Sequence, residues 1–394
     1  MEQPLRTSVT NDPAMIQRIL RELKGRADEM VQLLRRFVEC ESPSHDKAAV
    51  DAMGKVVAAE WRRDAAVRIL QQEKRGNHVR AEVWLDKGPP TGQILVLGHL
   101  DTVYPLGTLE KMPFRVSGGR AWGPGTFDMK GGLVLALAAI AALKSAAVRP
   151  RKRIVFLWTS DEEIGSGTSR QTIEREARAS DAVLVLEPGF GNEGRLKTSR
   201  KGVGHVEVTV TGRAAHAGID PEQGVNAVHE LAVQIARLMK MNDPRRGITV
   251  QATVVAGGTV SNVVPDLARA EVDIRLVRPS DARTIERKLR ALRPILKGAR
   301  VEVRGGMNRP PLERTAAVGA LFSHAQSLMG ELGIDLGEIS TGGGSDGNFT
   351  GAIGVPTLDG LGAVGAGAHT PQEHILIRKL PERAALIAGL LATL

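Results

Sequence analysis

Short apolar runs alternate with helical segments through the first half of the chain. Such runs occupy residues 94–97, 153–158 and 182–186, and a continuous apolar helix is expected over 130–144. A strand that helices cover on both faces is apolar along its whole length, as in a parallel sheet. The alternation therefore predicts an α/β domain with a mainly parallel sheet.

The middle of the chain has a different period. Residues 205–211 read His-Val-Glu-Val-Thr-Val-Thr, and this alternation is typical of a strand with one wet face. Helical and strand patterns then follow in the order helix, strand, strand, helix, strand, over residues 226–239, 248–255, 267–276, 280–292 and 300–304. The resulting βαββαβ order predicts a ferredoxin-like α+β fold, with one layer of helices on an antiparallel sheet.

The α/β pattern resumes after this middle segment, so the segment is interpreted as an insertion. We predict that residues 1–200 and 312–394 form one discontinuous α/β domain, and that residues 201–311 form the inserted domain. Two domains suit a chain of 394 residues. Hinges are expected near residues 199–202 and 310–313.

The composition excludes several kinds of site. The single cysteine, Cys40, can form neither an intrachain disulfide nor a thiolate-rich zinc site. The net charge of +9 comes from 53 Lys and Arg against 44 Asp and Glu, but the two signs are interspersed and aromatic residues make up only 3%. We therefore expect no nucleic-acid partner, and we interpret some arginines as groups that select an anionic substrate.

The chain also lacks the patterns of exported and membrane proteins. Residues 1–24 contain no apolar stretch of the secretory type and are expected to form a polar tail that runs into an amphipathic helix. No segment reaches about 18 uninterrupted apolar residues, the length that a membrane-spanning helix needs. We expect a cytoplasmic protein with no membrane partner.

Residue types that bind metals occur in five short segments. Three of these segments directly follow predicted strands, at the strand ends where open α/β sheets place their sites. The residues are His99, Asp101, Asp128, Glu162, Glu163, Glu187 and His369. Each has an ordinary alternative when taken singly, because a histidine can belong to the core and a Glu-Glu pair can begin a helix. Their similar placement after several strands favours a metal site.

Imidazole nitrogens and carboxylate oxygens suit zinc, cobalt or manganese. Two divalent ions about 3.5–4 Å apart need a bridging carboxylate and room for a water molecule. The adjacent residues Glu162 and Glu163 are expected to point in different directions. One can therefore bind a metal while the other acts as a base on the attacking water.

Three of these segments also resemble the signatures of a known family. They are Gly-His-Leu-Asp-Thr-Val at 98–103, Gly-Pro-Gly-Thr-Phe-Asp-Met-Lys-Gly-Gly at 123–132, and Thr-Ser-Asp-Glu-Glu-Ile-Gly-Ser at 159–166. The chain resembles the aminoacylase/glutamate carboxypeptidase family of co-catalytic zinc hydrolases. The resemblance extends in order over nearly the whole chain, includes the inserted domain, and is closest to the glutamate carboxypeptidases.

The resemblance implies two Zn²⁺ per subunit, with Co²⁺ or Mn²⁺ as possible substitutes. It implies that His99 and Glu187 hold one ion and that Glu163 and His369 hold the other. Asp128 would bridge the two ions, with a cis peptide bond to Met129. Glu162 would serve as general base and acid, and Asp101 would orient His99.

The inserted domain carries further matches, which give it a role as a lid and dimerisation domain. The resemblance implies that His216 reaches across a homodimer to stabilise the oxyanion in the partner's site. Four other positions would bind the substrate: Asn262, Arg275, and the backbone of Gly343 and Gly344. Arg275 would grip the free carboxylate, although ion pairing with the acids Glu271 and Asp273 on a wet sheet face is the alternative. Arg309 would select an acidic side chain or else remain solvated, and Lys201 is a weaker candidate.

These implications converge on a dizinc metallo-exopeptidase or amidohydrolase. Its substrate would be an N-acyl amino acid or a small peptide with a free C-terminal carboxylate. A biosynthetic deacylase of N-acetyl or N-succinyl amino acids is the alternative within the family, because the metal core is shared. A non-catalytic, metal-binding dimeric protein is an alternative of another class, but metal binding alone would not require Glu162.

Overall fold

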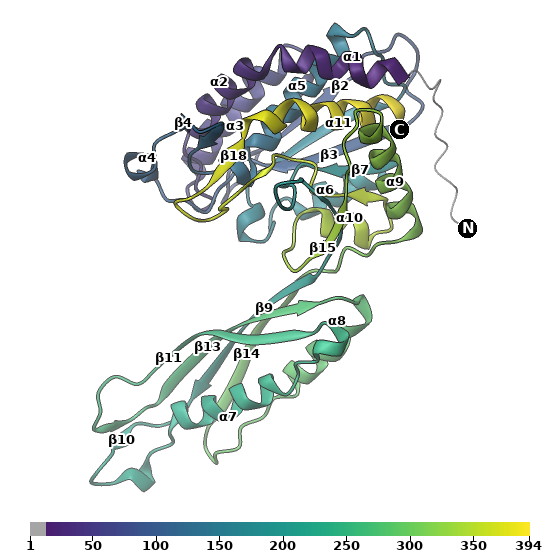
Figure 1. The fold of residues 1–394 in the computed structure, drawn as a ribbon. Coiled ribbons are helices and arrows are strands. Elements are labelled where there is room, and N and C mark those ends of the chain that lie inside the picture. The colour runs from purple at the N-terminus through teal and green to yellow at the C-terminus, as the bar shows by residue number, and fades with distance from the viewer. Residues whose placement is uncertain (1–12) are drawn as a thin grey trace. The chain divides into compact units, whose positions relative to one another are not determined.

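The computed structural model describes residues 13–394, and most of the expected N-terminal tail, residues 1–12, lies outside them. The described chain divides into two compact units (Figure 1). The first unit contains the chain up to Ser199 together with Arg314–Ser340 and Ser345–Leu394. The inserted unit contains Arg200–Glu313 and Thr341–Gly344.

A six-stranded sheet forms the centre of the first unit. Its strands, in spatial order, are β1 (Ala66–Leu70), β2 (His78–Val83), β6 (Arg153–Thr159), β3 (Gln93–His99), β7 (Ala182–Val185) and β16 (Thr357–Leu358). β3 runs parallel to β6 and β7, and β16 runs parallel to β7, whereas β1 and β2 form an antiparallel edge. The predicted α/β class with a mainly parallel sheet is confirmed.

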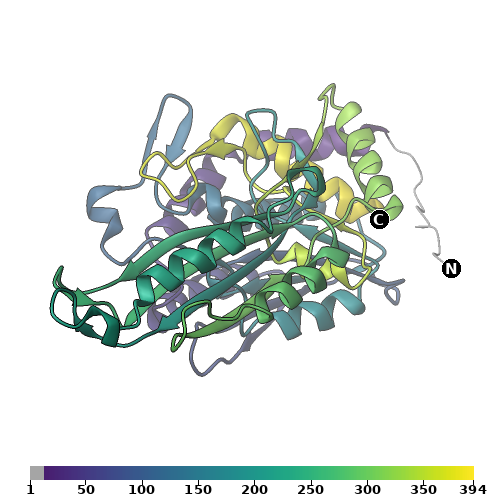
Figure 2. The ribbon, with the colours of Figure 1, turned by 90° about the horizontal axis from the view of Figure 1, so that it is seen from below.

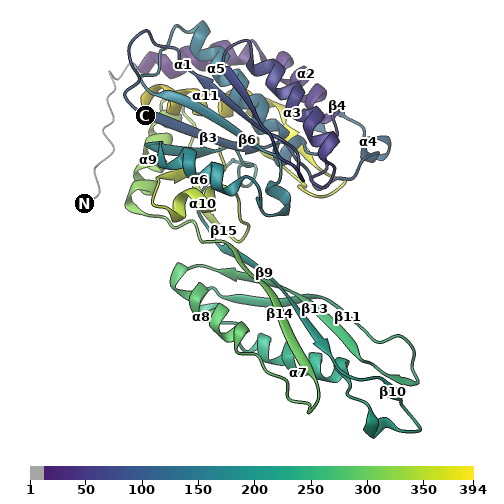
Figure 3. The ribbon, with the colours of Figure 1, turned by 180° about the vertical axis from the view of Figure 1, so that it is seen from behind.

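Helices cover both faces of this sheet, which explains why its central strands are apolar throughout. Ile94 and Val96 of β3 belong to the larger core, with side chains from six helices: α1 (Pro13–Lys24), α2 (Ala27–Val38), α3 (Lys47–Trp61), α5 (Gly131–Ser145), α9 (Ala316–Gly330) and α11 (Leu380–Thr393). Leu95 and Leu97 point to the other face and pack with α6 (Arg170–Arg178) and α10 (Gly347–Ala352). Figure 3 shows α6 and α10 on one side of β3 and β6, with α1, α2 and α5 on the other.

The apolar helix expected over residues 130–144 is α5. It forms part of Thr126–Ser145, which is long and apolar enough to cross a membrane by length and composition alone, but most of its apolar stretch is buried inside the protein. α5 packs against α1, α2 and α11, as a core helix does. Residues 16–38 carry apolar positions at helical spacing, but they form two helices, because α1 ends at Lys24 and α2 begins at Ala27.

The inserted unit is one antiparallel sheet covered by two helices. Its strands, in spatial order, are β11 (Thr249–Gly257), β13 (Leu267–Leu276), β9 (Gly202–Thr211) and β14 (Arg300–Arg309). Buried Val206, Val208 and Val210 of β9 share a core with α7 (Ala227–Met239) and α8 (Pro279–Arg290). Figure 2 shows the two helices against one face of the sheet. The chain order β9, α7, β11, β13, α8, β14 confirms the ferredoxin-like βαββαβ prediction.

Short elements complete the two units. The first unit also contains α4 (Thr108–Lys111) and a four-stranded sheet in the order β17 (Gly365–Ala366), β18 (His374–Leu376), β5 (Arg120–Trp122) and β4 (Arg115–Ser117). Two small ladders join β15 (Glu338–Thr341) to β8 (Leu196–Arg200), and β10 (Ala215–His216) to β12 (Val263–Val264).

Candidate metal centre

His99 is the last residue of β3 and is buried, with 1% of its surface exposed. Its Nδ1 lies 2.9 Å from the backbone carbonyl oxygen of Asp101, which can only accept a hydrogen bond. In the neutral ring Nδ1 therefore carries the proton, and Nε2 is left as the electron-pair donor. Nε2 lies 3.2 Å from Oδ1 of Asp128 and 3.5 Å from Oε1 of Glu187, a buried residue just beyond β7. A histidine whose ring is held by a hydrogen bond to another residue's backbone carbonyl is typical of a metal ligand.

Asp128 lies between two imidazoles. Its Oδ1 faces His99, and its Oδ2 lies 3.3 Å from Nε2 of His369. The peptide bond from Asp128 to Met129 is cis, as the resemblance implied. Two carboxylate oxygens that face two different imidazoles have the arrangement that a bridging ligand requires.

Glu162 and Glu163 lie in a single helical turn directly after β6. Oε2 of Glu163 lies 3.3 Å from Nε2 of His369. Oε1 of Glu163 is buried and has no hydrogen-bond partner among the described residues. A buried, unpaired carboxylate oxygen is costly, so this atom favours a bound cation.

Asp101 lies beneath this turn and is fully buried. Its carboxylate accepts hydrogen bonds from the backbone N–H groups of Glu162 and Glu163, both at 3.2 Å, and from the Ser44 hydroxyl at 2.7 Å. Its backbone carbonyl orients His99. Asp101 therefore joins the segment that carries His99 to the segment that carries the glutamates.

Two groups of side chains bring their ligand atoms within 4.8 Å of one another. The groups are His99, Asp128 and Glu163, and His99, Glu162 and Glu187. His369 adds a second imidazole from the loop between β17 and β18, where it adopts a left-handed conformation with φ 61°. The structure thus brings all seven predicted metal-site residues of the first unit together.

Negative charge dominates this cluster. Burial raises the pKa of Glu163 to about 7, and hydrogen bonds to Asp128 and Glu163 raise the pKa of His369 to about 10. Burial opposes ionisation of Asp128, but hydrogen bonds to His369 and His99 lower the pKa of its carboxyl group. Burial also opposes protonation of His99, but hydrogen bonds to Asp128 and Glu187 raise the pKa of its ring. The carboxylates thus stabilise positive charge at the imidazoles. A donor set of nitrogen and carboxylate oxygen with these properties fits a pair of divalent ions of the zinc class.

Two buried acids near these residues were not identified from the sequence. Asp346 accepts hydrogen bonds from the hydroxyls of Thr159 and Ser166, which flank the turn of Glu162 and Glu163. Glu373 is fully buried and contacts the segment before Asp128. The only sequence signal for Glu373 is its position four residues after His369.

The predicted substrate-binding residues of the inserted unit lie in two places. Arg275, near one end of β13, pairs with Asp273 and also donates through Nη1 to the Gly342 carbonyl at 3.2 Å. The carbonyls of Gly343 and Gly344 accept from Arg200, a buried arginine that sequence reasoning missed. Arg309, 5% exposed, packs against Gly344, where an added Cβ would lie 2.9 Å from its Cδ.

His216 and Asn262 lie together near the opposite end of the β9–β13 pair from Arg275. The backbone N–H of Ala217 donates to the Asn262 carbonyl at 2.8 Å, beside the pairing of β10 with β12. Nδ1 of the exposed His216 accepts from the N–H groups of Gly218 and Ile219, at 3.2 and 3.1 Å. The neutral ring therefore carries its proton on Nε2 and presents an N–H donor to solvent.

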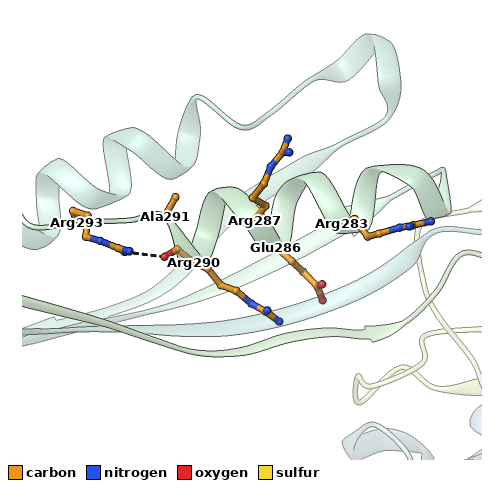
Figure 4. A pocket seen from close by; sticks show the side chains of 6 residues that line it. All are labelled: Arg283, Glu286, Arg287, Arg290, Ala291 and Arg293. Carbon is orange, nitrogen blue, oxygen red and sulfur yellow. Dashed lines mark hydrogen bonds between the residues drawn. The ribbon is translucent and has the colours of Figure 1, made fainter.

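A hollow of about 420 Å³ lies on the solvent side of α8 (Figure 4). Its lining includes four arginines, which are Arg283, Arg287, Arg290 and Arg293. Residues 200–313 hold 19 Lys and Arg against 12 Asp and Glu, so most of the basic excess belongs to the inserted segment. The one acid in the lining, Glu286, accepts the Met307 N–H at 3.3 Å. The lining contains no histidine and no pair of acids, so we take the His99 cluster as the candidate catalytic site.

Several known proteins are similar to this chain in sequence. The model of peptidase family M20/M25/M40 matches residues 95–393. Carboxypeptidase G2 of Pseudomonas sp. (strain RS-16) is 33% identical over 372 residues, which cover 93% of this chain and 89% of that protein. Succinyl-diaminopimelate desuccinylase of Dechloromonas aromatica (strain RCB) is 30% identical over 333 residues, covering 79% of this chain and 86% of that protein.

Solved structures agree on the fold. Aminopeptidase PepT from Bacillus cereus has a TM-score of 0.73 at 22% identity, covering 93% of this chain and 98% of that one. An M20 family metallo-carboxypeptidase from Sulfolobus solfataricus has a TM-score of 0.72 at 18% identity, with coverage of 93% and 99%. The resemblance seen in the sequence is thereby confirmed, and the chain is an enzyme that belongs to the metal-dependent peptidase family M20/M25/M40.

Proposed function

We propose that this enzyme hydrolyses the amide bond of an N-acyl amino acid or small peptide that has a free C-terminal carboxylate, in a site that holds two zinc ions. One observation carries the proposal: the two carboxylate oxygens of Asp128 face two imidazoles, and each imidazole has a further glutamate beside it. This arrangement provides two similar ligand sets that share one bridging carboxylate.

The ligand sets divide between the two imidazoles. His99 and Glu187 would hold one ion, Glu163 and His369 the other, and Asp128 both. Zinc suits these nitrogen and oxygen ligands, and cobalt or manganese could replace it. When bound, the ions polarise the scissile carbonyl and make attack by water possible at neutral pH.

Glu162 would move the proton. It adjoins Glu163 in the turn after β6, and a carboxylate oxygen of Glu162 lies within 4.8 Å of the ligand atoms of His99 and Glu187. In this position the carboxylate accepts a proton from the attacking water and then gives it to the departing amine. Asp101 would keep the turn and the His99 ring in place through its three hydrogen bonds to them.

Two substrate classes fit this chemistry. The match to carboxypeptidase G2 supports a peptide or acyl-amino-acid substrate, and the match to a succinyl-diaminopimelate desuccinylase supports a deacylase as the second candidate. A panel of N-acyl amino acids and dipeptides, assayed on zinc-loaded protein, separates the two. Hydrolysis of at least one class is expected, and no hydrolysis of either by metal-loaded protein would contradict the proposal.

Arg275 would bind the substrate carboxylate. Asp273 and Gly342 engage three of the five N–H groups of its guanidinium, so two remain for a second carboxylate. Asp273 also holds the guanidinium in a fixed orientation, which reduces the entropy lost when the substrate binds.

The variant Arg275→Ala is expected to lower kcat/KM by about 10²-fold, because a charge-assisted contact is lost. Wild type should cleave free acids much faster than C-terminal amides, and the variant should discriminate far less. Arg269→Ala is the matched control, since Arg269 is an exposed arginine on the same strand and face. Equal wild-type rates on acid and amide would contradict this role.

We further propose that the enzyme is a homodimer formed through the inserted unit. β11 is an edge strand whose second edge is unpaired among the described residues, and Val254 and Val255 on it are 50% and 59% exposed. Exposed apolar residues on a long edge strand favour pairing with another copy. In such a dimer the Nε2–H of His216 would donate to the oxyanion in the partner's site.

Mixing two inactive variants tests this arrangement. Glu162→Gln and His216→Ala chains are each expected to be nearly inactive. After equal amounts are mixed and subunits exchange, about half of the dimers contain one chain of each variant. One of the two sites in such a dimer combines an intact Glu162 with the partner's intact histidine, so about a quarter of wild-type activity is expected. Sedimentation equilibrium measures the oligomeric state. A monomer that is fully active, or mixed dimers in which no activity is restored, would contradict the proposal.

A further inference from the structure

Glu373 lies immediately before β18 and has no exposed surface. Its Oε1 accepts the backbone N–H groups of Phe127 and Asp128, at 2.8 and 2.9 Å. Its Oε2 accepts the backbone N–H of Gly125 at 3.0 Å and the Tyr104 hydroxyl at 2.5 Å. Both carboxylate oxygens are therefore fully engaged by donors from two other segments of the chain.

These donors belong to an irregular stretch of backbone. Gly125 has φ 72°, and Asp128 has φ −117° and ψ 97°, so neither residue has helical geometry. Backbone N–H groups in such a stretch cannot rely on a helix or sheet for partners. The Glu373 carboxylate provides those partners, and one of them is the N–H of Asp128 itself.

Three segments that carry site residues meet at this one carboxylate. Tyr104 follows His99 by five residues, the backbone donors lead into Asp128, and Glu373 follows His369 by four residues. A shift of Glu373 would change where Asp128 and His369 lie relative to each other. The hydrogen-bond partners of its carboxylate are the Tyr104 hydroxyl and backbone N–H groups of the segment that leads into Asp128.

We propose that Glu373 is a positioning residue that fixes Asp128 relative to His369, so that the one carboxylate of Asp128 can serve two ions. This inference rests on the proposed dizinc site. Glu373 acts through the backbone, so its loss weakens metal binding without removing a ligand. Loss of a group that holds a metal ligand in place typically weakens metal affinity by about 10- to 100-fold.

The isosteric variant Glu373→Gln isolates this effect. All four partners are donors, so a carboxylate can accept from each of them, whereas a glutamine places its own NH₂ group against some of them. Tyr104→Phe is a milder second variant that keeps the carboxylate. It removes the hydroxyl that lies 2.5 Å from Oε2 of Glu373 and 3.0 Å from the backbone carbonyl of Thr370, the residue after His369. Glu41→Gln is the matched control, since the Glu41 carboxylate also accepts two backbone N–H groups, those of Gly107 and Leu109, and contacts no site residue through them.

The measurements are zinc affinity of metal-free protein by chelator competition, the visible absorption spectrum of the cobalt-loaded protein, and the melting temperature without metal. We expect Glu373→Gln to bind zinc about 10- to 100-fold more weakly and to change the cobalt spectrum, with a smaller effect of the same kind for Tyr104→Phe. Glu41→Gln is expected to alter the melting temperature alone.

Unchanged zinc affinity and an unchanged cobalt spectrum in Glu373→Gln would overturn the inference, even if its melting temperature fell. If Glu373→Gln does not fold, Tyr104→Phe decides in the same way. A wild-type protein that binds no zinc would instead overturn the proposed dizinc site, and the inference with it.

Discussion

The variant Glu162→Gln is expected to lower kcat by about 10²- to 10⁴-fold, the contribution typical of a positioned general base. Glutamine has the same shape as glutamate but cannot accept the proton of the attacking water. The backbone N–H of Glu162 still donates to Asp101, so the turn that holds Glu163 should persist. Steady-state kinetics together with the metal content of the variant test this expectation.

The control for this variant is Glu110→Gln, which makes the same substitution at an exposed glutamate on α4. It should retain wild-type kcat. If Glu162→Gln kept most of its activity with two ions bound, another group would have to act as the base. If it lost its metal, Glu162 would be a ligand and not a proton carrier.

The variant Asp128→Asn is expected to bind fewer than two ions and to lower kcat/KM by about 10³-fold or more, since metal assistance contributes several kcal/mol. An asparagine has one oxygen and one NH₂ group, so it cannot face both imidazoles with acceptor atoms. His99 would keep Glu187 and His369 would keep Glu163, and one ion could still bind weakly. Elemental analysis of zinc-loaded, dialysed protein measures the loss.

Asp335→Asn is the control for this change, because Asp335 is an exposed aspartate of the first unit. It should bind metal as wild type does. Two tightly bound ions in Asp128→Asn would contradict the bridging role.

The sequence was most informative where one periodicity dominated. The uninterrupted apolar runs of β3 and β6 predicted strands covered on both faces, and the alternation in β9 predicted a sheet with helices on one face. Both predictions are confirmed, because a strand buried on both faces has successive apolar residues and a strand buried on one face has alternate ones. The metal-binding residue types were found because several follow buried strands directly.

Local breaks in the pattern were harder to predict. Apolar positions at helical spacing occur on both sides of Gly25, and this spacing alone did not predict that α1 and α2 are separate helices. The last strand of the insertion was expected over residues 300–304, but β14 continues to Arg309 because its partner β9 offers a long edge and accommodates an irregular register. Long-range pairing of this kind has no local signal.

Residues that act through the backbone were the hardest to identify. Glu373 and Arg200 bind backbone groups that lie far away in the sequence, about 250 and 140 residues along the chain. Their side-chain types are common, and their spacing from the metal-binding residues matches no simple motif. Only the folded arrangement of the loops brings them to Asp128 and to Gly343.

The central claim is that one site in each chain binds two metal ions and uses them for amide hydrolysis. The most direct measurement is a zinc titration of metal-free protein in which bound metal and the rate of hydrolysis are followed together. We predict that about two ions bind per chain and that the rate rises as the sites fill. Binding near zero, with a rate that neither zinc nor chelators change, would contradict the claim.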